Sequence, residues 1–230
     1  MQLSGKSILI TGGSRGIGRA TALLAAQQGA KVAVNYVSHQ SEAAQTVEEI
    51  KAAGGEAIMV QADVAKYDEV ETMINQVQQT FGSLDILVNN CGILSMKPLA
   101  EESIEKLDQM IAVNLGGPMH TIKAALPVML QQQSPATIIN VASQAAVDIF
   151  PGAFLATYSA TKAGVVRLTE VLAHELAATQ IKLFAVLPGG TATDMTDQQG
   201  MPAEKVGQRI VDAITEQLGL VSGAATEIFE

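Results

Sequence analysis

The feature that most limits the fold of this chain is a regular alternation of short apolar runs with amphipathic stretches over about 180 residues. The apolar runs are rich in Val and Ile and short enough for strands buried on both faces; they occupy residues 6–11, 31–36, 56–61, 85–90, 136–142 and 181–187. Apolar residues recur at helical spacing over residues 16–28, 41–53, 66–81, 104–132 and 158–178. A last helical pattern runs from 202 to about 218, and residues 225–229 could add an edge strand. This alternation predicts a doubly wound α/β fold, a parallel sheet of about seven strands with helices on both faces.

The 230 residues predict a single domain, residues 1–230, because no linker, repeat or low-complexity tract interrupts the pattern. No apolar run approaches the roughly eighteen residues of a membrane span, so we expect no membrane partner. The net charge of −9 argues against binding to nucleic-acid phosphates. The single cysteine, Cys91, together with a start that does not resemble a signal peptide, favours a reducing, cytoplasmic location. We therefore expect a small-molecule partner.

A glycine cluster, Thr11-Gly12-Gly13-Ser14-Arg15-Gly16-Ile17-Gly18, follows the first predicted strand and opens a helix. Glycines there let the backbone approach a pyrophosphate, whose charge then faces the helix N-terminus. A glycine-rich turn without a ligand is the plainer alternative. A P-loop is excluded because Arg19 and Ala20, rather than Lys and Ser or Thr, follow the last glycine.

The glycine spacing, G-x-x-x-G-x-G, resembles that of the short-chain dehydrogenase/reductase family, and further motifs follow in the family's order over nearly the whole chain. The matching segments are Asp63-Val64, Asn89-Asn90-Cys91-Gly92, Asn114, Ser143, Tyr158 with Lys162, and Pro188-Gly189 with Thr191 and Thr193. The resemblance implies a Rossmann-type fold and a nicotinamide cofactor. It implies cofactor contacts from Gly12, Ser14, Arg15, Gly16, Ile17, Gly18, Asn35, Tyr36, Asp63, Val64, Asn90, Gly92, Tyr158, Lys162, Pro188, Gly189, Thr191 and Thr193, and no metal site.

The resemblance also implies catalytic roles for Asn114, Ser143, Tyr158 and Lys162. Reducing a carbonyl with a hydride leaves negative charge on oxygen, so a proton donor must stand within reach of that oxygen. Tyr158 is the expected acid, and Lys162, at i+4 on the same helix face, is expected to lower its pKa from about 10. Ser143 would hydrogen-bond the substrate oxygen, and Asn114 would hold a water that links Lys162 to solvent. Taken singly, three of these residues have a purely structural explanation: Ser143 as a strand-end serine, Tyr158 as a core tyrosine and Asn114 as part of a helix kink.

The cofactor preference depends on charge at the end of the second predicted strand. An NAD enzyme usually has Asp or Glu there, whereas this chain has Asn35, Tyr36, Val37 and Ser38. Arg15 in the glycine loop could pair with a 2′-phosphate instead. The sequence therefore favours NADP(H) over NAD(H).

Three departures from the family pattern concern the substrate side and the oligomer. Ser143 and Tyr158 are separated by an interval of 15 residues, slightly longer than usual, so we expect residues 149–152 to bulge beside the substrate. The connection from Thr193 to Pro202 is short for a substrate lid, which predicts an incompletely covered site. Phe150 and Phe154 would then either supply an apolar wall to that site, or lie in the core while a neighbouring subunit completes the pocket. Residues 225–230 differ from the family's usual tail, so a homodimer or homotetramer is expected without a choice between them.

The leading hypothesis is NADPH-dependent reduction of a ketone or aldehyde, similar to the 3-oxoacyl-carrier-protein reductase and carbonyl reductase branches. A sugar, polyol or secondary-alcohol dehydrogenase is the enzymatic alternative. The non-enzymatic alternative is a dinucleotide sensor without catalytic activity, and the complete set of proton-transfer residues argues against it. Cys91 is expected to be a small apolar packing residue, since no motif pairs it with an activating base.

Overall fold

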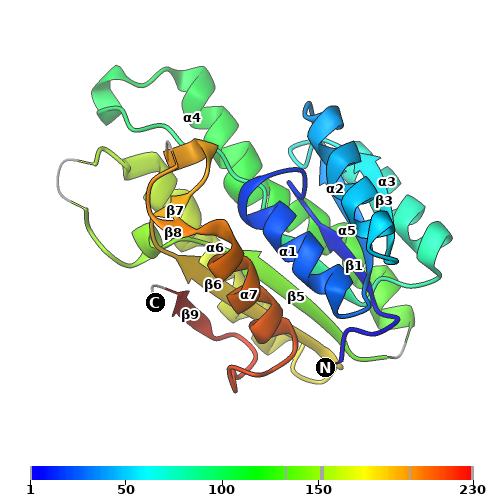
Figure 1. The fold of residues 1–230 in the computed structure, drawn as a ribbon. Helices are drawn as coiled ribbons and strands as arrows, with labels where there is room; N and C mark the ends of the chain where they lie inside the picture. Colours follow the sequence, from blue (N-terminus) through cyan, green and yellow to red (C-terminus); the bar gives the residue numbers. More distant parts are fainter. Residues whose placement is uncertain (1, 133, 151–152, 197, 229–230) are drawn as a thin grey trace.

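The computed structural model describes residues 2–132, 134–150, 153–196 and 198–228. A seven-stranded parallel sheet runs through the molecule, and its strands lie in the order β3-β2-β1-β4-β5-β6-β9 (Figure 1). The strands are β1 (Ser7–Ile10), β2 (Lys31–Tyr36), β3 (Glu56–Gln61), β4 (Ile86–Asn89), β5 (Ala136–Val141), β6 (Ile181–Pro188) and β9 (Ala225–Ile228). This arrangement confirms the predicted doubly wound α/β fold.

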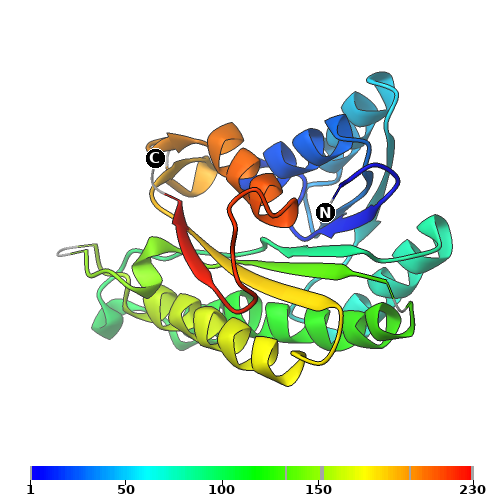
Figure 2. The same ribbon diagram turned by 90° about the horizontal axis from the view of Figure 1, so that it is seen from below.

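The central strands bury both faces, which explains why their sequences are continuous apolar runs. In β1, Ile8 and Ile10 point into one core and Leu9 into the other, as the two-residue period of a strand requires. The first core is covered by α1 (Gly16–Gln27), α2 (Gln40–Ala52) and α7 (Ala203–Ile214). The second is covered by α3 (Tyr67–Phe81), α5 (Gly117–Gln131) and α6 (Ala156–Glu175), and Figure 2 shows the two layers on opposite sides of the sheet.

The predicted helix over residues 104–132 is wrong as a single element. The structure divides it into α4 (Ile104–Ile111), a π-helical turn (Ala112–Gly116) and α5. Gly117 packs so closely on Val64 that an added Cβ would lie 2.8 Å from its Cγ2 atom. The apolar spacing continues through the turn, so periodicity alone does not reveal the extra residue per turn.

The region that the sequence predicts to be irregular, residues 188–200, holds a small parallel ladder. Strands β7 (Thr191–Ala192) and β8 (Met201–Pro202) pair with each other and are joined through a 3₁₀ turn at Asp194–Thr196. We call residues 191–202 the strap, of which residue 197 lies outside the described part. The expected edge strand at 225–229 is present as β9 over Ala225–Ile228, and residue 229 also lies outside the described part.

Among the described residues, no helix has the length and apolar character needed to cross a bilayer. The same residues hold no cluster of three or more metal-ligating side chains.

Candidate active site

The candidate site lies where the strand order reverses, between the carboxyl ends of β1 and β4. Thr11 joins the two ends: its Oγ1 accepts hydrogen bonds from the backbone N–H groups of Asn90 and Cys91, at 2.9 and 3.1 Å. Asn90 reciprocates, because its Nδ2 donates to the carbonyl oxygens of Thr11 (2.9 Å) and Gly12 (3.2 Å). The side chain of Asn90 therefore shapes the glycine loop.

The glycine loop has a conformation that only glycines adopt easily at two positions. Gly12 and Gly16 have φ of +62° and +53°. Gly18 is required for another reason, since a Cβ there would lie 2.6 Å from Asn90 Nδ2. Within the described chain, no side chain caps the start of α1, and its N-cap residue is Arg15. The N-terminus of α1 therefore offers backbone donors and a positive dipole end to an anion, which is what a cofactor pyrophosphate requires.

At the end of β2, Asn35 and Tyr36 are both buried. Asn35 Oδ1 accepts from the N–H of Gly12 (3.2 Å), and its Nδ2 donates to the carbonyls of Val60 (3.3 Å) and Ala62 (3.0 Å). The side chain of Tyr36 belongs to the core beneath α1 and α2. Asn35 thus holds the glycine loop in place through Gly12, a role that the sequence did not predict.

Asp63 and Val64 follow β3, and Asp63 lines a pocket of about 590 Å³. Asp63 Oδ1 accepts from the N–H of Ala65 at 3.0 Å, and Val64 is buried, with its carbonyl 2.9 Å from His120 Nδ1. The other residues that line this pocket are Val37, Gln61, Lys66, Asp68, Glu69 and Thr72. The pocket lies beside the predicted adenosine end of the cofactor.

Lys162 on α6 is only 4% exposed and donates from Nζ to the carbonyl of Val141 at 2.7 Å. A Cβ added to Gly92 would lie 3.5 Å from Lys162 Nζ and 3.5 Å from Asn114 Oδ1, so these three predicted residues meet. Burial lowers the pKa of Lys162 to about 8. The structure thus holds a cation of shifted pKa in the interior beside the ends of β4 and β5.

Tyr158 lies one helical turn before Lys162, with the lysine Nζ 5.9 Å from the centre of its ring. The expectation that Lys162 lowers the pKa of Tyr158 is wrong for this structure. Burial raises that pKa, and the hydrogen bond with Ser143 opposes the rise. Lys162 Nζ donates to the Val141 carbonyl, and burial and Ser143, rather than the lysine, shift the pKa of the phenol. Ser143 follows β5, and its Oγ also accepts from the N–H of Ala145 at 3.2 Å.

Asn114 is fully buried within the π-helical turn. Its side chain is held on both sides: Oδ1 accepts from the N–H of Ile93 (2.8 Å), and Nδ2 donates to the Ile93 carbonyl (2.9 Å) and to Thr161 Oγ1 (3.2 Å). Thr161 neighbours Lys162 on α6. The π turn therefore places Asn114 between the loop after β4 and α6.

The strap brings the predicted residues after β6 over the glycine loop. Thr193 is packed against Gly16, where an added Cβ would lie 3.1 Å from the threonine Cγ2. Thr191 is buried, and its Oγ1 donates to the carbonyl of Gly189 at 3.1 Å; Gly189 directly follows Pro188, the last residue of β6. The strap thus covers the N-terminus of α1 and does not extend away as a separate flap.

Arg15 is ion-paired with the strap, an interaction that the sequence did not predict. Its Nη1 lies 2.9 Å from Oδ2 of Asp194, and both side chains are more than half exposed, at 52% and 59%. Arg15, Asp194 and the 3₁₀ turn therefore link the glycine loop with the loop after β6.

Phe150 and Phe154 are exposed, at 42% and 54%, and so are Val147 and Ile149 on the same loop. The alternative that the two phenylalanines lie in the core is therefore wrong. Phe154 also has a φ of +50°, a strained value for a bulky residue. Residues 151 and 152 of the expected bulge lie outside the described part. Cys91 packs with the core beneath α3 and α5, and burial raises its pKa to about 11, which agrees with the expected packing role.

A buried polar network connects α6 and α5 with strands β4 and β5. Thr121 of α5 donates to Asn89 of β4 (2.6 Å), Asn89 donates to Asn140 of β5 (2.9 Å), and Asn140 donates to Thr169 of α6 (2.8 Å). All four side chains are buried. We call them the amide ladder. Only Asn89 stood in a recognisable motif, so the sequence offered no signal for its partners.

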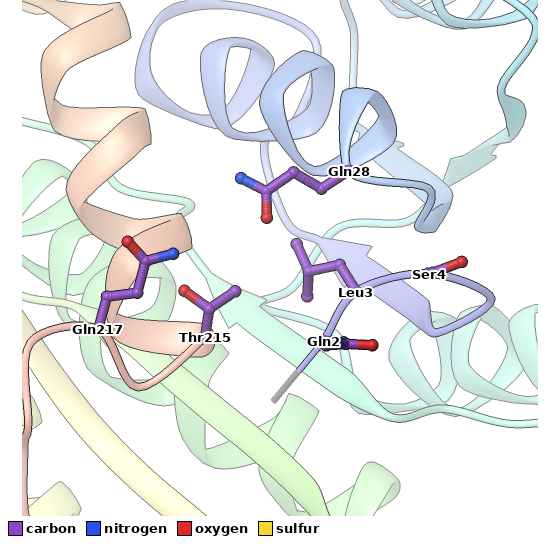
Figure 3. A pocket seen from close by; sticks show the side chains of 6 residues that line it. All are labelled: Gln2, Leu3, Ser4, Gln28, Thr215 and Gln217. Carbon is purple, nitrogen blue, oxygen red and sulfur yellow. The ribbon is translucent and has the colours of Figure 1, made fainter.

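A second pocket, of about 380 Å³, lies among residues Gln2, Leu3, Ser4, Gln28, Thr215 and Gln217 (Figure 3). These residues come from the chain start and from the ends of α1 and α7, at the amino ends of the strands. It lacks the predicted site residues, so we do not assign it to the active site.

Comparison with known proteins agrees with this geometry. A model of the short chain dehydrogenase family matches residues 6–203. The chain is 48% identical over 192 residues to the 3-oxoacyl-[acyl-carrier-protein] reductase FabG of Staphylococcus aureus, covering 84% of this chain and 77% of that protein. It is 38% identical over 216 residues to 3β-hydroxysteroid dehydrogenase 1 of Eggerthella lenta, covering 94% and 80%. A crystal structure of a short chain dehydrogenase from Burkholderia cenocepacia in complex with NADP has a TM-score of 0.92 and 31% identity, covering 99% of this chain and 98% of that one.

Proposed function

Because the chain belongs to the short-chain dehydrogenase family and is an oxidoreductase of that family, we propose that it reduces a ketone or aldehyde to an alcohol with NADPH. The observation that carries the proposal is the meeting of Tyr158, Ser143, Lys162 and Asn114 at the carboxyl ends of β4 and β5. Bound nicotinamide would supply the hydride.

The protein residues would control the proton and the developing charge. Tyr158 Oη would donate a proton to the substrate oxygen, and because burial raises the pKa of this phenol, efficient transfer needs a positive charge brought closer to the hydroxyl. Ser143, hydrogen-bonded to Tyr158, would donate to the same oxygen and stabilise its charge. Lys162 would turn from the Val141 carbonyl toward the cofactor ribose and the phenol. Asn114 would keep the π turn and the Ile93 backbone in place and hold the water expected there.

The residues present fit a dinucleotide. The close contact at Gly18 and the uncapped start of α1, among the described residues, provide a backbone surface for the pyrophosphate. Ser14, Ile17, Gly92 and Gly189 complete the expected contacts along it. Asp63 lines the pocket at the adenosine end, where we expect it and the neighbouring Val64 to contact the adenine. We assign NADP(H) because residues 33–38 contain no acid and because Arg15 lies close enough to the start of α2 for its charge to lower the pKa of Glu42.

The substrate we propose is an apolar carbonyl compound. Exposed Val147, Ile149, Phe150 and Phe154 all follow Ser143 in the loop that leads to Tyr158, so an apolar substrate placed at the hydroxyls would contact them. The relatives named for 3-oxoacyl and hydroxysteroid substrates support this class. The hydroxysteroid relative also keeps secondary-alcohol oxidation as the second candidate. A homodimer or homotetramer and a cytoplasmic location stay predictions.

Tyr158→Phe tests the catalytic assignment. It removes the proton donor and almost no volume, so we expect kcat to fall by roughly 10²–10⁴ while the cofactor Kd changes only a few-fold. Tyr67→Phe is the matched control, since Tyr67 packs on His120 of α5 and is not among the proton-transfer residues, so this change should keep the parent's kcat. A Tyr158→Phe enzyme with the parent's kcat would remove this residue from the mechanism. A panel of ketones, aldehydes and secondary alcohols, followed by NADPH absorbance, would identify the direction and the substrate.

A further inference from the structure

Asp194 holds the one arginine that the glycine loop offers to a cofactor. Arg15 Nη1 donates to Asp194 Oδ2 at 2.9 Å, while Gln198 Nε2 donates to the other oxygen, Oδ1, at 2.9 Å. The carboxylate is thus fixed from two sides. Arg15 consequently points forward to the strap at the carboxyl end of β6.

The alternative position for the guanidinium lies toward the start of α2. There the pKa of Glu42 is lowered, mainly by its hydrogen bond with Ser41 and in smaller part by the charge of Arg15. This is the end of β2, where the adenosine ribose of a cofactor lies in a doubly wound fold. Arg15 cannot form a direct ion pair with Asp194 and with a 2′-phosphate in that region through the same donor.

The strap that carries Asp194 has a defined closed form. The N–H of Met201 donates to the Gly190 carbonyl at 2.8 Å, and Gly200, with φ of +108°, lies where an added Cβ would be 2.8 Å from the N atom of Thr191. Thr196 Oγ1 lies within hydrogen-bonding distance of the carbonyls of Thr191, Thr193 and Gln199, and its single proton is donated to one of them. The Arg15–Asp194 ion pair and the Thr193–Gly16 contact then connect this closed turn with the glycine loop.

We propose that Asp194 is a specificity-determining residue, which competes with the cofactor's 2′-phosphate for Arg15 and thereby couples recognition of that phosphate to release of the strap. The proposal rests on the assignment of NADP(H) above. A 2′-phosphorylated cofactor exchanges one ion pair of Arg15 for another, whereas NAD(H) leaves the pair with Asp194 intact. Asp194 therefore reduces the preference for NADP(H) that Arg15 provides.

The expected effect is modest because the ion pair is exposed. Pairs of this kind contribute little, so Asp194→Asn should tighten binding of a 2′-phosphorylated ligand about two- to five-fold. Binding of the unphosphorylated ligand should not change.

The test uses the full-length protein and two probes without nicotinamide, adenosine 2′,5′-bisphosphate and 5′-AMP, with Kd measured by calorimetry. Asp194→Asn should improve only the bisphosphate. Glu170→Gln, which breaks the exposed Arg167–Glu170 pair on α6, is the matched control for net charge and should change neither Kd. In an Arg15→Ala background, Asp194→Asn should have no effect, since the competition needs the guanidinium. An equal gain in that background would mean direct repulsion of the phosphate and would overturn the proposal.

Hydrogen exchange gives a readout independent of affinity. The bisphosphate should accelerate exchange of the Met201 N–H in the parent protein, and 5′-AMP should not. Unchanged exchange at saturating bisphosphate would refute the coupling to the strap. If Arg15→Ala leaves the ratio of the two Kd values unchanged, the NADP(H) assignment itself fails. If Arg15→Ala lowers the ratio but Asp194→Asn does nothing, only the role of Asp194 fails.

Discussion

Replacing Lys162 with methionine should stabilise the fold while it abolishes turnover. The lysine is 4% exposed and its pKa is about 8, against an ordinary value of 10.5, because burial disfavours the charge. A lysine pKa lowered by folding means that the unfolded chain binds the proton more tightly. The wild-type protein therefore loses stability as the pH falls from 10.5 to 8, and below 8 the full penalty is present.

The size of this penalty follows from the difference between the ordinary lysine pKa of 10.5 and the pKa of about 8 in the folded protein. At 1.36 kcal/mol per unit it amounts to about 3 kcal/mol at pH 7, about 2 at pH 9 and about 1 at pH 9.5. Methionine has a side chain of similar length, but it leaves the Val141 carbonyl without its hydrogen-bond donor, which costs about 1–3 kcal/mol at every pH. We expect a net gain of about 1 kcal/mol at pH 7, a rise in Tm of roughly 2–4 °C for a chain of this size.

Urea unfolding of both proteins from pH 7 to 9.5 would measure the difference in the free energy of unfolding. Its decline by about 1–2 kcal/mol over that range is the decisive quantity, because the unpaired carbonyl contributes equally at each pH. Lys51→Met, on the exposed face of α2, is the control and should show no such slope. A difference between wild type and Lys162→Met that stays constant with pH would show that Lys162 does not carry a buried charge, and the reasoning would be wrong.

Further predictions concern the glycine loop, the cysteine and the apolar loop. Gly18→Ala should abolish cofactor binding and lower the free energy of unfolding by about 1–3 kcal/mol, since its Cβ would collide with Asn90; calorimetry and urea unfolding would show both. Cys91 should react with a thiol reagent at pH 8 far more slowly in the folded than in the urea-unfolded protein, because burial raises its pKa to about 11, and equal rates would contradict that burial. Replacing Phe150 and Phe154 together with Ala should lower kcat/KM for aromatic or long-chain ketones more than for short ones, and an equal loss for all would mean that they do not contact substrate.

The sequence predicted the layers and the site's members because both have local signals. Buried parallel strands appear as apolar runs, and residues such as Tyr158 and Lys162 lie at a fixed spacing on one helix. The π turn at Ala112–Gly116 escaped because one extra residue hardly disturbs apolar spacing over a long helix.

Contacts between distant segments had no such signal. Arg15 and Asp194 are 179 residues apart, and their pairing depends on how the strap folds over α1. The direction of the Tyr158 pKa was also predicted wrongly, since spacing places Lys162 on the same helix face but does not say that its Nζ turns to Val141.

The amide ladder constrains how this chain can change over generations. Asn89 Nδ2 donates to Asn140 Oδ1 in the interior, so an apolar replacement of Asn89 leaves that oxygen without its donor, and one of Asn140 leaves that Nδ2 without its acceptor, at a cost of about 1–3 kcal/mol. Replacing both with apolar residues of similar size removes the unpaired groups together, so the double change should be tolerated better than the sum of its steps. The two positions are therefore epistatic, because the cost of replacing one asparagine depends on whether the other is still present. A protein that carries this pair can lose it one substitution at a time only through a less stable intermediate.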